Sequence, residues 1–412
     1  MRIEKKSLVL FISLFLSVIL GSFIWEFISL PFTDPGIIGE YSINNFNSAN
    51  DIFRYIFFIS LPIFIYVIFQ FFFQKFTIND FKFILNESEK FNFKTEKSLY
   101  IILIILIIFI FIDFLSVDFP IHKIDSFHEG QRLSSSYKSF IDNSLWSGSY
   151  LTTGVFHEIL GLKIIWKIFG YESIGLARFV DIFLVFVMKL LLTVFAFLIT
   201  KFLNLNNFYK NIFFIFNSFI FLSLLDYNTA SVDQISYREI PVILSSILFI
   251  IFLTNKNSHN LILIILGSIS VLSILWGVDR GLVTNLIIMT ICIYLFLTKD
   301  IKKLFILFFS SLFFWLLFYI LAGNEFDYFI SNTYSILKEM NYVHGIIHPT
   351  PFSEDPNSYR ASKTLISIII CLLVSIDLFF KISKKFSISF KIALFMLALI
   401  SFLSYIYALG RS

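Results

Sequence analysis

The sequence predicts an all-α integral membrane protein that crosses the bilayer about eleven times. Hydrophobic residues make up 58% of the 412 residues and charged residues only 15%, whereas soluble domains are nearer half apolar and one-quarter charged. Apolar runs recur along the whole chain, and most approach the ~20 residues that a helix needs to cross the hydrocarbon core. The net charge of +4 implies no nucleic-acid partner, because basic residues between membrane helices set their orientation.

The first apolar run follows MRIEKK and extends from Leu8 to about Leu30. This run is longer than the apolar region of a signal peptide and carries no small-residue cleavage site, so we predict a retained helix. Further helices are predicted at 55–74, 98–117, 176–203, 212–226, 241–254, 260–277, 282–298, 304–322, 363–380 and 388–409. The runs at 212–226 and 241–254 are the shortest of the set.

Lysine and arginine predict the orientation of these helices. If every run crosses once, the basic N-terminus, the segment 75–97, TKDIKK and KISKKF all fall on one side. We interpret this side as the cytoplasm, which places the chain in the inner (plasma) membrane with a cytoplasmic N-terminus. The opposite side receives 31–54, 118–175, 227–240, 278–281 and 323–362, which hold most of the remaining ionisable residues.

Two domains are expected from this arrangement. Residues 1–97 would form two helices and a cytoplasmic loop, and residues 98–412 would form a membrane core with large outer loops at 118–175 and 323–362. Within the first outer loop, residues 151–171 (LTTGVFHEILGLKIIWKIFGY) place apolar residues at helical spacing among charged ones. This pattern predicts amphipathic helices that lie in the membrane interface.

The most unusual stretch is IDSFHEGQRL, which directly follows a long apolar run. On a helix, Asp125, His128 and Glu129 would share one face, and a carboxylate partly removed from water can serve as a general base. The alternative is a solvated loop. His128–Glu129 and His157–Glu158 lack the HExxH spacing of zinc proteases, but a divalent cation such as Mg or Mn held partly by Asp125 or Glu129 stays open.

Arg132 follows Glu129 in the acidic loop, and arginines with acids also stand at the predicted outer ends of several helices: Arg178 with Asp181, Arg238 with Glu239, and Asp279 with Arg280. An arginine in such a place can bind phosphate through its planar fork. The alternatives are snorkelling to the interface for a single arginine and an interhelical salt bridge for Asp279 and Arg280. We expect Arg280 to contribute to the same outer cavity as the loop 125–132.

DSFHEGQRL, YLTTGVFHE, WGVDRG and YALGRS together resemble motifs of bacterial multi-pass proteins in the glycosyltransferase-C (GT-C) superfamily. Their counterparts read roughly D-x-x-H-E-G, D-R-G and a-L-x-R-S-D, and the resemblance covers about 98–412. It implies a GT-C-like fold and the transfer of a sugar from a polyprenyl-phosphate carrier to an acceptor on the outer face. The superfamily usually places the acidic loop after its first helix, whereas here two further helices, at 8–30 and 55–74, come before the helix that leads into the loop.

Carried over by position, Asp125 would be the general base, with Glu129 and His128 beside it. The resemblance also implies substrate-binding roles for the arginines and Asp279 named above and for Arg411. The last motif stops at Arg411–Ser412, before its expected Asp. The hypothesis that the sequence is a fragment without its downstream helices therefore stays open. The implied partners are a lipid-linked sugar donor, a glycan, lipid or protein acceptor, and membrane lipids.

Two other interpretations remain. An O-antigen polymerase or ligase would use the loop 323–362, and Arg360 or His348 would then matter more than Asp125. A transporter or lipid flippase belongs to a different class and would need a polar path through the centre of the membrane.

Overall fold

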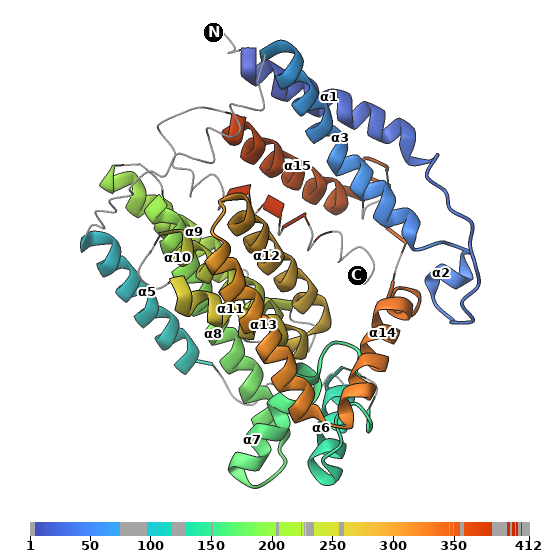
Figure 1. Cartoon of the computed structure of the whole chain (residues 1–412), viewed down its shortest axis with the longest axis vertical. Helices are drawn as coiled ribbons and strands as arrows, with labels where there is room; N and C mark the ends of the chain where they lie inside the picture. Colours follow the sequence, from blue (N-terminus) through green and yellow to red (C-terminus); the bar gives the residue numbers. More distant parts are fainter. Residues whose placement is uncertain are drawn as a thin grey trace. The chain divides into compact units, whose positions relative to one another are not determined.

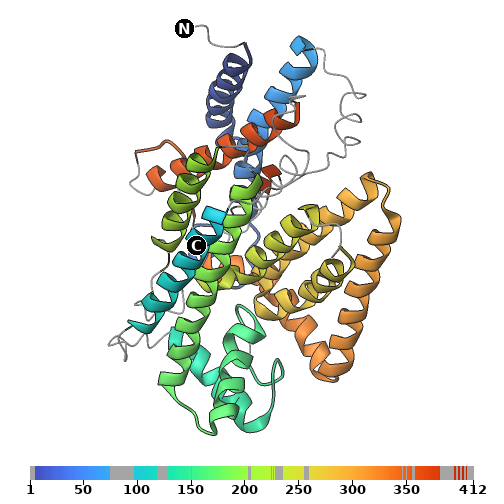
Figure 2. The ribbon, with the colours of Figure 1, turned by 90° about the vertical axis from the view of Figure 1, so that its left-hand side faces the viewer.

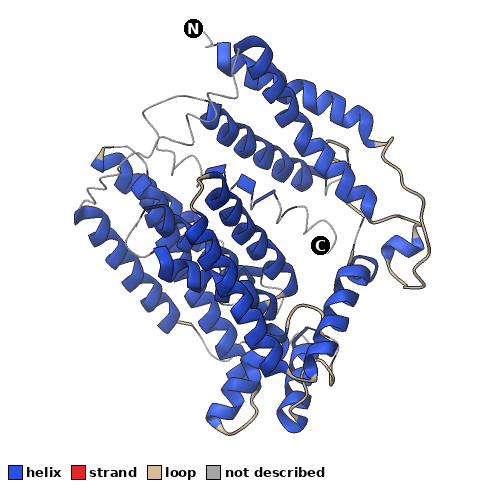
Figure 3. Ribbon diagram, viewed as in Figure 1, coloured by secondary structure: helices blue, strands red, loops and turns tan. Residues whose placement is uncertain are grey.

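Every regular element in the described part of the chain is a helix, and no strand occurs there (Figure 3). The computed structural model describes residues 5–74, 97–117, 128–149, 151–202, 206–223, 225, 227, 235–254, 259–345, 347–348, 350–354, 358–380, 394–395, 398–399, 401–402 and 405. The prediction of an all-α protein is confirmed for these residues.

Seven helices of the described residues are long and apolar enough to cross a membrane: Leu8–Trp25, Ala49–Phe72, Lys97–Leu115, Ile174–Lys201, His259–Trp276, Val278–Phe296 and Ile301–Ala322. They indicate a multi-pass membrane protein. The predicted runs at 212–226 and 241–254 correspond to α9 (Asn207–Ser223) and α10 (Ile240–Thr254), which have 17 and 15 residues. The run at 388–409 lies mostly outside the described residues, so the total of eleven crossings stays a prediction.

The chain divides into two compact units. Unit 1 comprises Met1–Glu89 and Tyr334–Ser412, and unit 2 comprises Lys90–Thr333. The division falls inside α14 (Glu325–His344).

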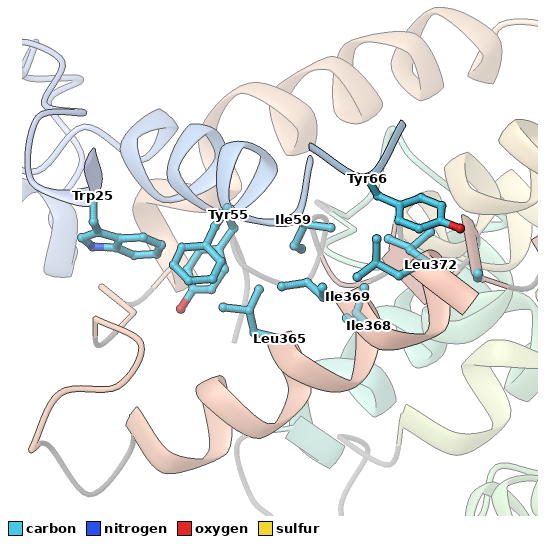
Figure 4. Close-up of a cluster of buried hydrophobic side chains, with 11 residues drawn as sticks. Trp25, Tyr55, Ile59, Tyr66, Leu365, Ile368, Ile369 and Leu372 are labelled. Carbon is cyan, nitrogen blue, oxygen red and sulfur yellow. The ribbon is translucent and has the colours of Figure 1, made fainter. Parts of the chain in front are cut away.

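Unit 1 is built on α1 (Lys5–Trp25), α3 (Ala49–Gln74) and α15 (Ser358–Phe380), with the short α2 (Glu40–Ile43) between the first two. Its core is apolar and aromatic, and Figure 4 shows Trp25, Tyr55, Ile59 and Leu365 in this cluster. The Trp25 and Tyr55 rings meet edge to face at 4.9 Å. These contacts bury the apolar faces of all three helices against one another.

Unit 2 contains two groups of long helices. In one, α5 (Lys97–Leu115) and α9 pack along α8 (Ile174–Phe202); in the other, α11 (His259–Trp276) packs against α12 (Val278–Leu297) and α13 (Ile301–Ala322) (Figure 1). The helix α10 contacts both α8 and α12 and so joins the two groups. Pro241 stands in the first turn of α10, where its missing N–H removes no helical hydrogen bond.

Three short helices of unit 2 lie near the N-terminal end of α8: α6 (His128–Asp142), the π-helix η1 (Phe156–Leu160) and α7 (Gly161–Phe169) (Figure 2). Residues 156–169 are thus helical, as the periodicity of 151–171 predicts. Leu162 and Trp166 are buried, whereas Ile164 and Ile168 are exposed. The chain leaves α7 at Gly170, whose φ of 79° lies in the left-handed region that glycine adopts without strain.

Candidate functional site

The short helices and the adjoining helix ends of unit 2 carry a concentration of buried charge. We call it the charged network and define it by Glu129, Arg132, Arg178, Asp181, Arg238, Glu239, Asp279 and Arg280, with His157 and Tyr237 between them. These residues come from α6, η1, α8, α12 and the 3₁₀ helix η2 (Ile235–Glu239), which leads into α10. Buried charges are costly unless they are paired and hydrogen-bonded, so such a concentration needs an explanation.

The first half of the network joins α6 to α8. Arg178 donates from Nε and Nη2 to the two oxygens of Glu129, at 2.9 and 3.0 Å, and Arg132 donates from Nη1 to Asp181. Glu129 and Arg132 are three residues apart on α6, as are Arg178 and Asp181 on α8, so each helix presents both partners on one face. The two helices are therefore held by a reciprocal pair of ion pairs.

The second half joins η2 to the start of α12. Arg238 donates from Nη2 to Asp279 at 2.6 Å, and the Nε of Arg280 lies 2.5 Å from an oxygen of Glu239. Asp279 also accepts the backbone N–H of Arg280, one of the donors that a helix leaves unpaired in its first turn. A carboxylate at this position is further stabilised by the dipole of α12.

Tyr237 and His157 connect the two halves. The Tyr237 hydroxyl donates to Asp181 and lies 3.2 Å from His157 Nδ1. Because its single proton goes to the carboxylate, the hydroxyl oxygen accepts from Nδ1–H, which leaves His157 Nε2 unprotonated. Burial, followed by the charges of Arg132 and Arg238, lowers the pKa of His157 well below its usual value. The imidazole is thus neutral at pH 7.

The partly exposed side of the network is formed by carboxylates. The side chains of Asp181 and Glu239 are 28% and 24% exposed, against 5% for Arg132 and 11% for Arg280, their respective partners. A molecule that reaches these two pairs from solvent meets carboxylate oxygens first. At these two pairs a phosphate meets the carboxylate before the guanidinium, whereas the Arg238 side chain is 15% exposed and that of its partner Asp279 only 4%.

The structure brings together six of the residues that the sequence analysis singled out: Glu129, Arg132, Arg178, Arg238, Asp279 and Arg280. Asp125 and Arg411 lie outside the described residues, as does the side chain of His128, although its backbone begins α6. Both oxygens of Glu129 are engaged by Arg178, so a role for Glu129 as base would require this pair to open.

Tyr237 is a member of the network that the sequence does not predict. The signal in the sequence is weak, because a tyrosine at the end of a polar loop is common; the neighbouring Arg238–Glu239 pair before an apolar run is the only feature that marks this stretch. Asp181 and Glu239 stand near arginines in the sequence and His157 beside Glu158, but their partners are not predictable from that position. Their roles as partners of Arg132, Arg280 and Tyr237 depend on elements distant in the chain.

The predicted divalent cation stays a prediction. The described residues contain no group of three or more His, Cys, Asp or Glu side chains that could hold a metal ion. Asp125, one of its expected ligands, is not among the described residues, and Glu129 is engaged by Arg178.

Comparisons of the chain with protein-family models, curated proteins and solved structures find no match. The functional interpretation of the charged network therefore depends on its residues and their geometry.

Proposed function

We propose that this protein is a membrane glycosyltransferase that moves a sugar from a polyprenyl-phosphate carrier to an acceptor on the extracytoplasmic face. The observation that carries the proposal is the charged network: four guanidinium–carboxylate pairs at the ends of apolar helices. Ionisable groups buried in a helical membrane protein are costly, and they tend to mark the place where substrates are handled.

A lipid-linked sugar phosphate makes three chemical demands, and unit 2 offers groups suited to each. The apolar carrier tail requires an apolar surface, which the exposed isoleucines and phenylalanines of α5 and α13 supply. The phosphate requires cations, which Arg238, the more exposed member of its pair, and Arg280, once Glu239 is displaced, would supply. The sugar hydroxyls require hydrogen-bond acceptors, and Asp181 and Glu239 are partly exposed carboxylates.

In the proposed reaction, the oxygen of an acceptor hydroxyl attacks the anomeric carbon and forms the new glycosidic bond. The bond from that carbon to the carrier phosphate breaks, and the phosphate leaves with the electron pair. The hydroxyl proton passes to a carboxylate, for which we propose Asp125, three residues before α6 begins. The pairing of Glu129 with Arg178 favours Asp125 over Glu129 in this role. A single base with inversion at the anomeric carbon is the simplest case.

The transporter alternative has one observation in its favour. Lys189 pairs with Asp113 at 2.7 Å inside two of the spanning helices, and its ammonium group stands 3.8 Å from the centre of the Tyr227 ring. Intramembrane ion pairs also occur in carriers. We favour the transferase because the charged network brings four ion pairs together, whereas the spanning helices contribute the Lys189–Asp113 pair.

The test is transfer by purified protein from radiolabelled polyprenyl-phosphate hexoses and pentoses to a membrane extract. Asp125→Asn should lower the rate by about 10²–10⁴-fold, and Arg280→Ala should weaken binding of polyprenyl phosphate alone, measured by thermal shift. The matched control is Asp142→Asn, which removes an exposed carboxylate of α6 that accepts hydrogen bonds from the nearby Ser144. Transfer with none of the donors, or full activity of Asp125→Asn, would contradict the proposal. Uptake of the donor into proteoliposomes without transfer would favour the transporter.

A further inference from the structure

The segment 151–158 joins more parts of unit 2 than any charge pair of the network. Leu151 exchanges two hydrogen bonds with the Asn332 side chain on α14, both at 3.0 Å. Gln131 on α6 donates to the Thr152 hydroxyl at 2.9 Å, and Ser136 on α6 donates to the backbone oxygen of Glu158 at 2.7 Å. The segment thus connects α6, α14 and η1.

The same segment determines where α12 begins. The Thr153 carbonyl accepts the backbone N–H of Val278, the first residue of α12, at 2.7 Å. Gly154 lies directly against Gly277: a Cβ on Gly154 would stand 2.6 Å from the Gly277 Cα and from the Trp276 carbonyl oxygen. The following two residues, Asp279 and Arg280, belong to the charged network.

Glu158 holds this segment in place. Its Oε1 accepts hydrogen bonds from the Thr152 hydroxyl at 2.9 Å, from the Thr153 hydroxyl at 2.8 Å and from the Thr153 backbone N–H. The side chain is buried, and its Oε2 accepts no hydrogen bond from any described residue. The residue lies in η1, and π-helical turns of this kind are frequent at functional sites.

We propose that Glu158 is a positioning residue for the charged network. Its carboxyl group fixes the Thr152–Thr153 turn, the turn fixes the first amide of α12, and α12 thereby presents Asp279 and Arg280 to Arg238 and Glu239. The catalytic consequence rests on the proposed function, whereas the positioning of α12 does not. In Glu158→Gln, the amide oxygen can take the place of Oε1 and keep the turn. In Glu158→Ala, the Thr152 hydroxyl, the Thr153 hydroxyl and the Thr153 N–H lose their common acceptor.

Hydrogen exchange measured by mass spectrometry on the full-length protein tests the positioning without any substrate. Glu158→Ala should raise the exchange rate of the amides in 277–284 by about tenfold or more, and Glu158→Gln should stay within about threefold of wild type. The matched control is Glu325→Ala, because Glu325 also accepts the backbone N–H and the hydroxyl of one residue, Ser147, although that residue is distant in the chain. This control should leave 277–284 unchanged.

The transfer assay tests the consequence for the network. Glu158→Ala should lower kcat by about 10–10²-fold with little change in KM for the donor, and Glu158→Gln should restore most of kcat. A wild-type protein without transfer activity would refute the proposed function and leave the exchange measurement to decide the role of Glu158.

Unchanged exchange in Glu158→Ala, or an equal increase in Glu325→Ala, would overturn the inference. If Glu158→Ala does not fold, Thr153→Val replaces it, because it removes one hydroxyl donor and keeps the backbone N–H. Faster exchange at 277–284 in Thr153→Val would then support the inference, and unchanged exchange would refute it.

Discussion

The two units bury their polar side chains in different ways. In unit 1, the cluster around Trp25, Tyr55 and Leu365 is apolar and aromatic, and the buried Asp377 accepts a hydrogen bond from the Tyr66 hydroxyl within it. In unit 2, guanidinium and carboxylate groups from several elements meet at the helix ends. A chain of one overall composition thus builds a largely apolar core in one unit and a charged site in the other, and the proposed function places the reaction in unit 2.

The largest expected effect is loss of one partner in the network. Arg178→Ala leaves the buried Glu129 carboxylate without its bidentate partner, and we expect a loss of about 3–5 kcal/mol in the free energy of unfolding, measured by thermal unfolding in detergent. The double replacement of Glu129 by Leu and Arg178 by Met should recover most of this stability and remain inactive in transfer. Recovery of activity would show that the pair serves packing alone.

A truncation in the core of unit 1 should destabilise by a different route. Ile369 is fully buried in the cluster of α1, α3 and α15, so Ile369→Ala should cost about 2–5 kcal/mol through lost burial and the cavity that remains. Because this cluster holds no part of the network, we expect the folded fraction of the variant to keep its KM for the donor. A changed KM would weaken the contrast between the units.

The network should also make stability depend on pH. Burial lowers the pKa of His157, which faces Arg132, Arg238, Asp279 and Tyr237. The unfolded state therefore binds a proton more readily, and stability falls as the pH drops below about 6.5 towards the lowered pKa, by up to about 1.4 kcal/mol per pH unit. Thermal unfolding at pH 7.5, 6.5 and 5.5 measures the slope. His157→Asn can still donate a hydrogen bond to Tyr237 but carries no titrating group, so it should flatten the dependence of stability on pH. An equal slope in this variant would mean that other groups cause the dependence.

The smallest effect should come from Tyr66 and Asp377, a buried polar pair of unit 1. Asp377→Asn keeps an oxygen that can accept from the Tyr66 hydroxyl, so we expect a change of only about 0.5–1.5 kcal/mol in the free energy of unfolding. Thermal unfolding of this variant beside Arg178→Ala compares the two units directly. A loss as large as that of Arg178→Ala would mean that unit 1 also depends on a charged group.

Much of the fold follows from local sequence. Apolar runs such as SLYIILIILIIFIFIDFL have the length and hydropathy of a spanning helix wherever they lie, and seven such helices appear among the residues that the structure describes. The amphipathic periodicity of 151–171 likewise predicts the helical turns of η1 and α7. Six residues of the candidate site could be singled out from charge at helix ends, because ionisable groups are rare and costly beside such runs.

The sequence by itself determined that the chain is helical, apolar enough for a membrane, and charged where its long helices end, since these properties depend on residues close together in the chain. Only the tertiary structure decided that Arg132 pairs with Asp181, Arg280 with Glu239 and Tyr237 with both Asp181 and His157. An arginine can reach several carboxylates of similar chemistry, and the packing of α6, α8, η2 and α12 selects among them. The role of Glu158 depends on packing in the same way, because the turn that it holds acts on a helix more than a hundred residues further along the chain.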